Sequence, residues 1–286
     1  MKYVFIKTNG EQWSIERLCQ VLEVSSSGYY DWLNRPVSKR AEEAVKLTEQ
    51  IIMFHCGSGC TYGSPRIYKD LKAAGVKTAR KRVERLMKAA ALKGKSKRKD
   101  KTTTNSKHQR PRVEKLLKQD FKAEQPNQAW VSDITYLATL EGWLYLAVVL
   151  DLFSRKVIGW AFSKRLTDEL TLSALDLALK QRHLSKDLIF HSDQGSQYAS
   201  KAFQVKLEKH NIQQSMSGKG NCFDNPVAES FFATLTTEEV DDRPYLTRQQ
   251  AKTSIFKYIE GFYNTRRRHS TLDYLSPNTF ESLYYG

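Results

Sequence analysis

Apolar side chains recur at two different spacings along the chain, and the change falls near residue 127. Before it they lie three or four residues apart, as on one face of an α-helix; Ile15, Leu18, Cys19 and Leu22 are one such set. After it, short apolar runs typical of strands alternate with helical stretches. The pattern therefore predicts an all-α N-terminal part followed by an α/β part.

Two helix-turn-helix units are predicted in the N-terminal part. The first covers residues 1–36, with two short helices on either side of a break at residues 24–28, and an ordinary helical hairpin would give the same pattern. The second covers residues 37–92. Ser64 followed by Pro65 predicts a helix start there, because a capping hydroxyl precedes a residue whose ring suits the first helical position.

The α/β part covers residues 127–240 and is followed by a helical extension at residues 241–286. Its expected elements are antiparallel strands at 129–139, 143–151 and 156–162, a helix at 167–182, a strand at 187–191, a helix at 200–210 and a strand at 212–216. A helical crossover makes the fourth strand run parallel to the first. This order specifies a ribonuclease-H-like α/β fold, a five-stranded mixed sheet with flanking helices.

Positive charge is concentrated in the N-terminal part. Residues 1–112 carry 25 Lys+Arg against 10 Asp+Glu, and residues 113–286 carry 21 against 21, so the whole net charge of +15 lies before residue 113. This asymmetry indicates a basic module for a polyanion, nucleic acid above all, joined to a neutral module with another task. A basic surface that serves only solubility is the alternative.

Basic side chains dominate both the helix expected at residues 78–92 and the segment 93–126. On the helix only Glu84 offers a nearby countercharge, which favours contact with phosphates. The segment begins with few apolar residues, and we interpret it as a flexible basic linker between domains. The candidate DNA-contacting residues are Arg66, Arg80, Lys81, Arg82, Arg85, Lys88, Lys97, Arg98, Lys99, Lys219, Arg266, Arg267 and His269.

Several other classes of protein are disfavoured. The apolar run at residues 3–6 is too short for a signal peptide, and no stretch approaches the ~20 apolar residues of a membrane span. Four cysteines in 286 residues do not make a disulfide framework, and a zinc site at His55, Cys56 and Cys60 would lack a second ligand pair. We therefore expect a protein of the reducing cytoplasm.

Three acidic residues occupy positions where secondary-structure elements would expose them. Asp133 interrupts an apolar strand, Asp193 follows the fourth expected strand, and Glu229 lies in the first turn of a later helix. Carboxylates brought together at a sheet end repel one another unless a cation lies between them, and ligation by oxygen alone selects Mg²⁺ or Mn²⁺. Asp151 also ends a strand, so the pattern alone leaves open whether such acids are ligands or caps.

Five stretches of the α/β part stand out as motifs. They are Trp130-Val-Ser-Asp-Ile-Thr-Tyr136, Leu150-Asp-Leu-Phe-Ser-Arg155, His191-Ser-Asp-Gln-Gly-Ser-Gln-Tyr198, Asn225-Pro-Val-Ala-Glu-Ser-Phe-Phe232 and Tyr263-Asn-Thr-Arg-Arg-Arg-His-Ser-Thr-Leu272. Together they resemble the catalytic half of bacterial insertion-sequence transposases of the OrfB type, which share an Asp–Asp–Glu core with retroviral integrases. The 35 residues between Asp193 and Glu229 match the spacing of that family. Tyr62-Gly-Ser-Pro-Arg-Ile67 resembles the helix-turn-helix unit that precedes this core.

This resemblance implies that Asp133, Asp193 and Glu229 are catalytic residues that hold two Mg²⁺ ions, for which Mn²⁺ would substitute. It implies an enzyme that cleaves phosphodiester bonds at insertion-sequence ends with water and then joins the freed strand to target DNA, its 3′-hydroxyl attacking a target phosphodiester and displacing that bond's leaving oxygen, without a covalent protein–DNA intermediate. The expected partners are double-stranded DNA (terminal repeats and target), further copies of the chain and an OrfA-type protein or fusion. The expected location is the bacterial cytoplasm, at the nucleoid.

One position departs from the family pattern. Members usually carry Lys or Arg seven residues after the glutamate, whereas this chain has Thr236. A hydroxyl brings no charge to terminal DNA, so Lys219 or Arg266 would assist, or this copy would be impaired. Two alternatives stay open: a nuclease of the same fold that does not join strands, and a DNA-binding regulator with an inactive core.

Overall fold

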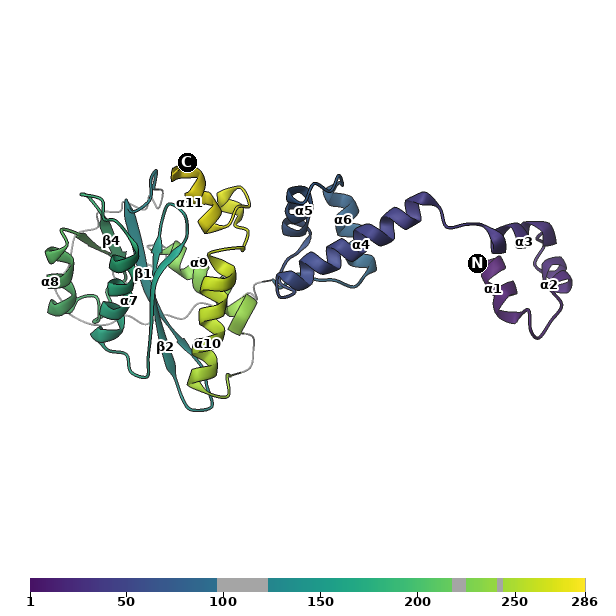
Figure 1. Ribbon diagram of the computed structural model, residues 1–286. Coiled ribbons are helices and arrows are strands. Elements are labelled where there is room, and N and C mark those ends of the chain that lie inside the picture. Colours follow the sequence, from purple (N-terminus) through teal and green to yellow (C-terminus); the bar gives the residue numbers. More distant parts are fainter. Residues whose placement is uncertain (97–122, 218–224, 241–243, 286) are drawn as a thin grey trace. The chain divides into compact units, whose positions relative to one another are not determined.

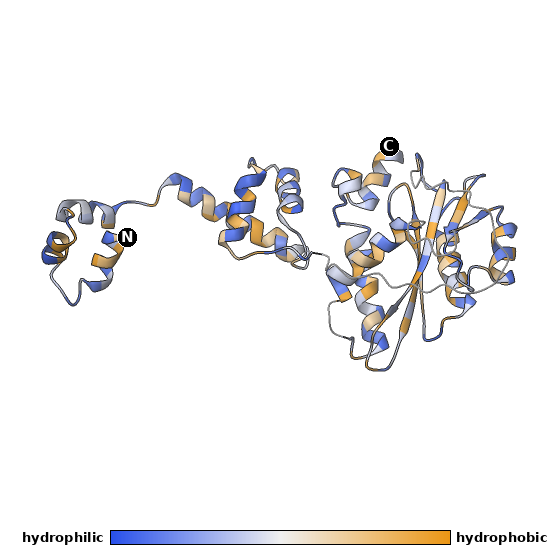
Figure 2. Ribbon diagram, turned by 180° about the vertical axis from the view of Figure 1, so that it is seen from behind, coloured by the Kyte–Doolittle hydropathy of each residue, from blue (hydrophilic) through white to orange (hydrophobic). Residues whose placement is uncertain are grey.

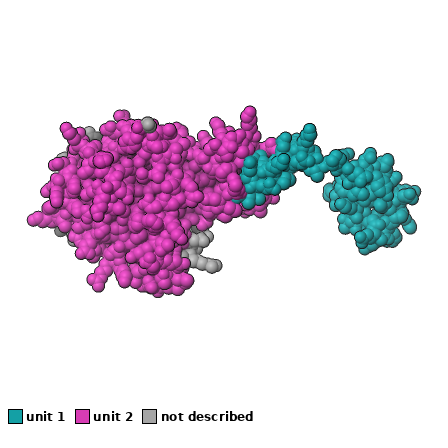
Figure 3. Space-filling model, viewed as in Figure 1, with its two compact units in different colours: residues 1–52 teal, residues 53–286 magenta. Residues whose placement is uncertain are grey.

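The computed structural model describes residues 1–96, 123–217, 225–240 and 244–285. The chain divides into two compact units, residues 1–52 and residues 53–286 (Figure 3). The second unit therefore combines the helices that follow residue 53 with the α/β part. This division reflects packing, whereas the boundaries expected near residues 36, 92 and 126 rest on composition and stay predictions.

The first unit is all-α. Its helices are α1 (Lys2–Asn9), α2 (Ile15–Val21), α3 (Ser26–Asn34) and the larger part of α4 (Lys39–Gly57). Ile6, Cys19 and Tyr29 form its buried core. The Ser14 and Ser25 hydroxyls cap α2 and α3 by accepting backbone N–H groups. The two helices expected around a short break are present, and α1 is additional; its start has no capping side chain to reveal it.

A second helical pair opens the larger unit. Helices α5 (Ser64–Ala73) and α6 (Arg80–Ala89) pack through buried residues, which are Ile67, Leu71, Val83 and Met87. The expected start near Ser64 is confirmed with one correction. Gly63 occupies the cap position and Ser64 is already helical, so no side chain caps α5. Pro65 supplies the start signal alone, because its missing N–H costs nothing in the first turn.

Five strands form one mixed sheet in the order β3-β2-β1-β4-β5 (Figure 1). Their bounds are β1 (Ala129–Leu137), β2 (Leu144–Asp151), β3 (Val157–Ser163), β4 (Ile189–Ser192) and β5 (Gln213–Met216). Strands β1, β2 and β3 pair antiparallel, and β4 pairs parallel with both β1 and β5. The expected meander and parallel return are thus confirmed, and with them the ribonuclease-H-like class.

Helices cover both faces of this sheet, and apolar residues are frequent on the strands and on the helices beside them (Figure 2). Helices α7 (Asp168–Gln181) and α8 (Lys201–Lys209) share one core with the even-numbered positions of β1, such as Trp130. Helices α9 (Pro226–Leu235) and α10 (Arg248–Tyr258) share the other core with odd-numbered positions, such as Val131. Gly159 of β3 lies directly against α7, where a Cβ would collide with the Ala174 carbonyl.

Irregular helices complete the C-terminal part. A π-helix, η2 (Thr236–Val240), continues α9, and a second, η3 (Ile259–Tyr263), continues α10. A 3₁₀ turn, η4 (Ser270–Leu272), precedes the last helix, α11 (Pro277–Tyr285). No helix among the described residues is long and apolar enough to cross a membrane.

Candidate active site

Strand register brings the first two candidate acids level with each other. Strands β1 and β4 are parallel, and Val131 pairs with His191. Two residues further along each chain, this register places Asp133 beside Asp193, which directly follows β4. Parallel neighbours in register point to the same face of the sheet, so both carboxylates belong to the face covered by α9. The C-terminal end of a parallel strand such as β4 is a common position for ligands in α/β proteins.

The third acid is delivered by the start of α9. The Asn225 side-chain amide donates to the Ser132 carbonyl over 3.0 Å, which ties the helix start to β1 immediately before Asp133. Glu229 lies in the first turn of the helix, with its N–H donating to the Asn225 carbonyl. Pro226 fixes the first helical position. The helix therefore presents Glu229 on the side of the sheet that carries Asp133.

The electrostatics of Asp133 reflect these neighbours. Burial first, then the charge of Asp193 and to a smaller extent that of Glu229, together raise the pKa of its carboxyl group to about 7. The N–H of Ile134, 2.8 Å from Asp133 Oδ1, acts in the opposite direction. Asp133 is half-buried, whereas Asp193 and Glu229 are exposed. A half-buried carboxylate that feels two others is poised to gain from a cation.

The acids are near one another without forming a closed ligand cage. No group of three or more Asp, Glu, His or Cys side chains is close enough to hold a metal ion within the described ranges. Residues 218–224, which lead into α9, lie outside those ranges. The donor set nevertheless fits a hard divalent ion, because it consists of carboxylate oxygens whose mutual repulsion such an ion would remove.

A buried chain of hydrogen bonds fixes Ser132, the residue that directly precedes Asp133 in β1. The Ser132 hydroxyl donates to the Val148 carbonyl over 2.7 Å, so the Tyr198 hydroxyl, 2.8 Å away, must donate to Ser132. Burial and the charges of both aspartates raise the pKa of Tyr198 well above its ordinary value, which keeps it a donor. Sequence reasoning placed Tyr198 in a motif and gave it no role. Its position nine residues after the start of β4, at the end of that motif, was the signal that could have drawn attention to it.

The loop after β4 is shaped around Asp193. The Gly195 N–H donates to Asp193 Oδ1 over 3.0 Å, and a Cβ at Gly195 would lie only 2.9 Å from the same oxygen. His191 is fully buried, with its ring nitrogens 2.9 Å from the Ser215 hydroxyl and 3.3 Å from that of Ser217. His191 is therefore a structural link between β4 and β5, which fixes the point from which Asp193 projects.

Asp151, the competing acid, has a structural role. It is completely buried and accepts the N–H groups of Asn127 and Phe153, each over 2.9 Å. Burial raises its pKa to about 6, and these two N–H groups together with Arg182 act against that rise. Asp151 therefore closes the turn after β2 and is separate from the three candidate acids.

The basic residues expected to contact DNA fall into three groups. Arg80, Lys81, Arg85 and Lys88 are exposed on α6, with Arg82 half-buried beside them. Lys97, Arg98, Lys99 and Lys219 lie outside the described residues. Arg66, Arg266, Arg267 and His269 gather near α9 and η3, where only Arg266 is exposed. Thr236 is exposed directly after α9, at the position where the family resemblance led us to expect a Lys or Arg.

Arg267 and His269 are placed unlike DNA-contacting residues. Arg267 is 4% exposed and donates two hydrogen bonds of 2.7 Å to Glu238, a residue that sequence reasoning did not single out. Tyr258 donates to the same carboxylate over 2.8 Å, and Arg66 lies 3.4 Å from it. Arg267 thus joins η2 to the segment after η3. That Arg267 also contacts DNA stays a prediction.

His269 is neutral in the folded chain. Burial lowers its pKa to about 2, and the charges of Arg267, Arg66 and Arg155 contribute. In the unfolded chain an ordinary histidine titrates near pH 6.5, so the unfolded state binds more protons below that pH. Stability from neutral His269 is thus present above pH 6.5 and lost as the pH falls.

We expect this loss to be measurable as a pH-dependent unfolding free energy. Between pH 7 and pH 5 the unfolding free energy of the wild type should fall by about 2 kcal/mol more than that of His269→Gln. Denaturant titrations of both proteins at each pH measure this difference. His183, which is exposed, provides the matched control: His183→Gln should follow the wild type. Parallel curves for wild type and His269→Gln would contradict a buried neutral imidazole.

Family models and relatives agree with this architecture. An integrase core domain model matches residues 123–222, a second integrase core domain model matches residues 210–277, and an HTH-like domain model matches residues 42–100. The transposase InsF for insertion sequence IS3A of Escherichia coli (strain K12) is 42% identical over 284 residues, 99% of each chain. The insertion element IS600 uncharacterized 31 kDa protein of Shigella sonnei is 42% identical over 268 residues, 94% of this chain and 98% of that one.

Two solved structures resemble parts of the chain. The HTLV-2 integrase catalytic core domain in complex with magnesium (dimeric form) is 19% identical, covers 56% of this chain and 99% of its own, and gives a TM-score of 0.43. A simian T-cell lymphotropic virus intasome in complex with PP2A regulatory subunit B56 gamma is 18% identical. The match covers 82% of this chain and 66% of that one, with a TM-score of 0.38. The full-length relatives carry the assignment: the chain belongs to the IS3 family of insertion-sequence transposases, enzymes with an integrase core behind a helix-turn-helix-like domain.

Proposed function

We propose that Asp133, Asp193 and Glu229 are the metal ligands and catalytic residues of this transposase. The observation that carries the proposal is the parallel register of β1 and β4, which sets Asp133 beside Asp193 on the face where α9 brings Glu229. The raised pKa of Asp133 supports it, because the charges of both other acids reach that carboxyl group. Three acids from separate elements meet here for a purpose other than stability, since their repulsion is a cost.

The ligand set suits two Mg²⁺ ions, with Mn²⁺ as a substitute, because it offers oxygen atoms only. Bound there, such ions would activate the attacking water or 3′-hydroxyl and stabilise the leaving oxygen of a phosphodiester. Asp133 lies on a strand, and the carboxylate of Asp193 accepts the Gly195 N–H. Glu229 lies on a helix whose start is hydrogen-bonded to β1. Rigid supports of this kind keep the ligand geometry constant during the reaction.

Double-stranded DNA is the substrate in both steps: the insertion-sequence end is cleaved, and the target receives the cleaved strand. The exposed cations of α6 can contact the phosphates of double-stranded DNA whatever its sequence, in the terminal repeats and in the target. Bridging two ends requires more than one copy of the chain, so we propose a homo-oligomer assembled on DNA. An OrfA-type partner or fusion would supply further end recognition, at the bacterial nucleoid in the cytoplasm.

A joining assay tests this function. The wild type, Glu229→Gln and a wild-type sample with chelator are incubated with labelled terminal DNA, a target plasmid and Mg²⁺. Joined product in the first sample alone supports the transposase. Nicking without joining would instead indicate a nuclease of the same fold, and DNA binding without any metal-dependent product would indicate a regulator with an inactive core.

A further inference from the structure

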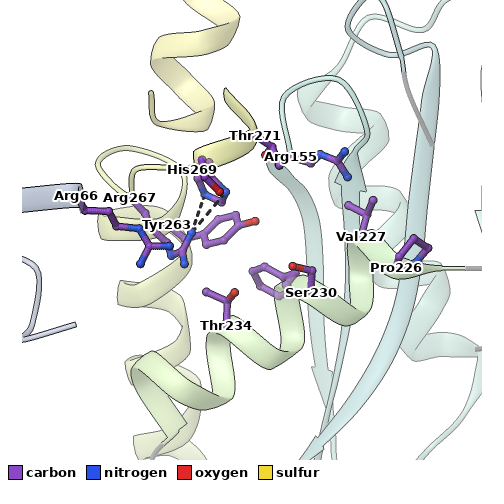
Figure 4. A pocket seen from close by; sticks show the side chains of 12 residues that line it. Arg66, Arg155, Pro226, Val227, Ser230, Thr234, Tyr263, Arg267, His269 and Thr271 are labelled. Carbon is purple, nitrogen blue, oxygen red and sulfur yellow. Dashed lines mark hydrogen bonds between the residues drawn. The ribbon is translucent and has the colours of Figure 1, made fainter. Parts of the chain in front are cut away.

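A cavity of about 340 Å³ lies alongside α9, the helix that carries Glu229 (Figure 4). Helix α9 contributes Pro226, Ser230 and Thr234, which are spaced four residues apart and therefore form one stripe along the helix. Ser230 directly follows Glu229 in the chain. In the close view Arg155 lies near the first residues of α9, whereas Arg267 and Arg66 lie toward its other end. The cavity thus extends along the helix that carries Glu229, although Glu229 itself is not one of the residues that line it.

The cavity is positively charged. Arg66, Arg155 and Arg267 line it, and within the described part of the chain the carboxylate paired with them is that of Glu238, which Arg267 and Arg66 share. Three guanidinium groups against one carboxylate leave a net charge of +2. Burial, and after it the charges of these three arginines, lower the pKa of His269, which therefore adds no positive charge of its own to the cavity. Hydroxyl groups of Ser230, Thr234, Ser270 and Thr271 complete the polar lining.

Arg155 is the arginine whose charge is not balanced. Among the described residues no carboxylate lies within ion-pair distance of it, although it is half-buried and burial lowers its pKa. Its backbone is held in the turn between β2 and β3, with φ of 61° and its N–H donating to the Asp151 carbonyl over 2.9 Å. A guanidinium cannot lose its proton at neutral pH. A desolvated cation of this kind is costly unless an anion completes it.

We propose that this cavity binds a backbone phosphate of the DNA strand adjacent to the scissile phosphate, with Arg155 as its anchor. The guanidinium offers a bidentate fork that matches a phosphate, and Ser230 and Thr234 offer hydroxyl donors on the opposite side. The inference rests on the proposed function, because it takes the scissile bond to lie at the three acids. It also gives the chain a cationic DNA contact beside α9, where Thr236 brings no charge.

The test is a scan of DNA binding with single neutral phosphates. A short duplex copied from the element's own end is made with one methylphosphonate at a time, and its affinity is measured by fluorescence anisotropy without divalent metal. One position next to the cleaved bond should weaken wild-type binding about tenfold, the effect expected from a charge-assisted hydrogen bond. Arg155→Gln should bind unmodified DNA equally weakly and lose all sensitivity to that position.

Salt dependence gives a second readout. Removal of one phosphate contact should lower the slope of log affinity against log salt concentration by about 0.9 in Arg155→Gln. Arg155→Lys should keep the slope and lose part of the affinity, since it retains the charge and loses the fork. This variant and the wild-type scan keep the test decisive if Arg155→Gln does not fold. Lys180→Gln, an exposed cation on the opposite face of the sheet, should match the wild type throughout.

The outcomes separate this inference from the function beneath it. If no phosphate position is coupled to Arg155, or if Lys180→Gln shows the same coupling, the pocket does not bind the strand, even in a chain that cleaves and joins DNA. If the coupling is found in a chain that shows no metal-dependent cleavage, the phosphate pocket stands and the proposed chemistry fails.

Discussion

Asp193→Asn should abolish DNA cleavage and strand transfer, with rates falling at least about 10³-fold. An amide keeps the shape of the carboxylate and removes the negative charge, so it gives up several kcal/mol of the charge stabilisation supplied through a metal-bound site. DNA binding in the absence of metal should stay within about twofold of the wild type, because the exposed cations of α6 are untouched. Single-turnover cleavage of labelled terminal DNA measures the first quantity, and anisotropy the second.

The matched control for this variant is Asp187→Asn. Asp187 is exposed and precedes β4, so it lies on the same part of the chain as Asp193 without sharing its strand end. Its variant should cleave at the wild-type rate. Near-normal cleavage by Asp193→Asn in Mg²⁺ would contradict the assignment of Asp193 as a ligand, and equal losses in both variants would point to general damage.

Glu238→Ala should destabilise the larger unit by about 3–5 kcal/mol, because it leaves Arg267 buried without its carboxylate. Both side chains are at most 5% exposed, and Tyr258 would lose its acceptor as well. Urea unfolding, followed by near-ultraviolet circular dichroism, measures the change. A double variant with Arg267→Met should lose less than the sum of the single variants, since it no longer holds an unpaired buried charge.

Glu208→Ala provides the comparison for Glu238→Ala. Glu208 is exposed on α8, and a substitution there should change the unfolding free energy by no more than about 0.5 kcal/mol. A Glu238→Ala variant as stable as this control would mean that the ion pair contributes nothing to the fold. Arg267 would then be available to DNA, as its sequence first suggested.

The order of the sheet could be predicted because it depends on local patterns. Apolar runs of strand length, the turn at Glu141-Gly142 and the periodic helix at residues 167–182 each carry their own signal, and the right-handed crossover fixes how they join. The same reasoning placed Asp193 at a strand end. It could not separate Asp151 from Asp133, because the difference lies in which N–H groups and which helix surround each carboxylate, and the resemblance to a family decided between them.

The roles of residues whose partners lie far away in the chain could not be predicted from the sequence. Glu238 is 29 residues from Arg267, and nothing in the local pattern pairs them. A run of arginines in Tyr263-Asn-Thr-Arg-Arg-Arg-His-Ser270 has the composition of a DNA-binding segment, yet packing buries Arg267 and leaves Arg266 exposed. Arg155 shows the converse case. It belongs to a motif that carries the family resemblance, and the use we propose for its charge came only from its place in the cavity beside α9.

If Asp133, Asp193 and Glu229 hold two divalent ions, anomalous diffraction from crystals of the chain bound to its terminal DNA and Mn²⁺ will locate them. We expect two peaks about 3.5–4 Å apart, each about 2.1 Å from oxygen atoms of these three carboxylates. Peaks held by other side chains, or no peak between these acids in a complex that cleaves DNA, would contradict this expectation.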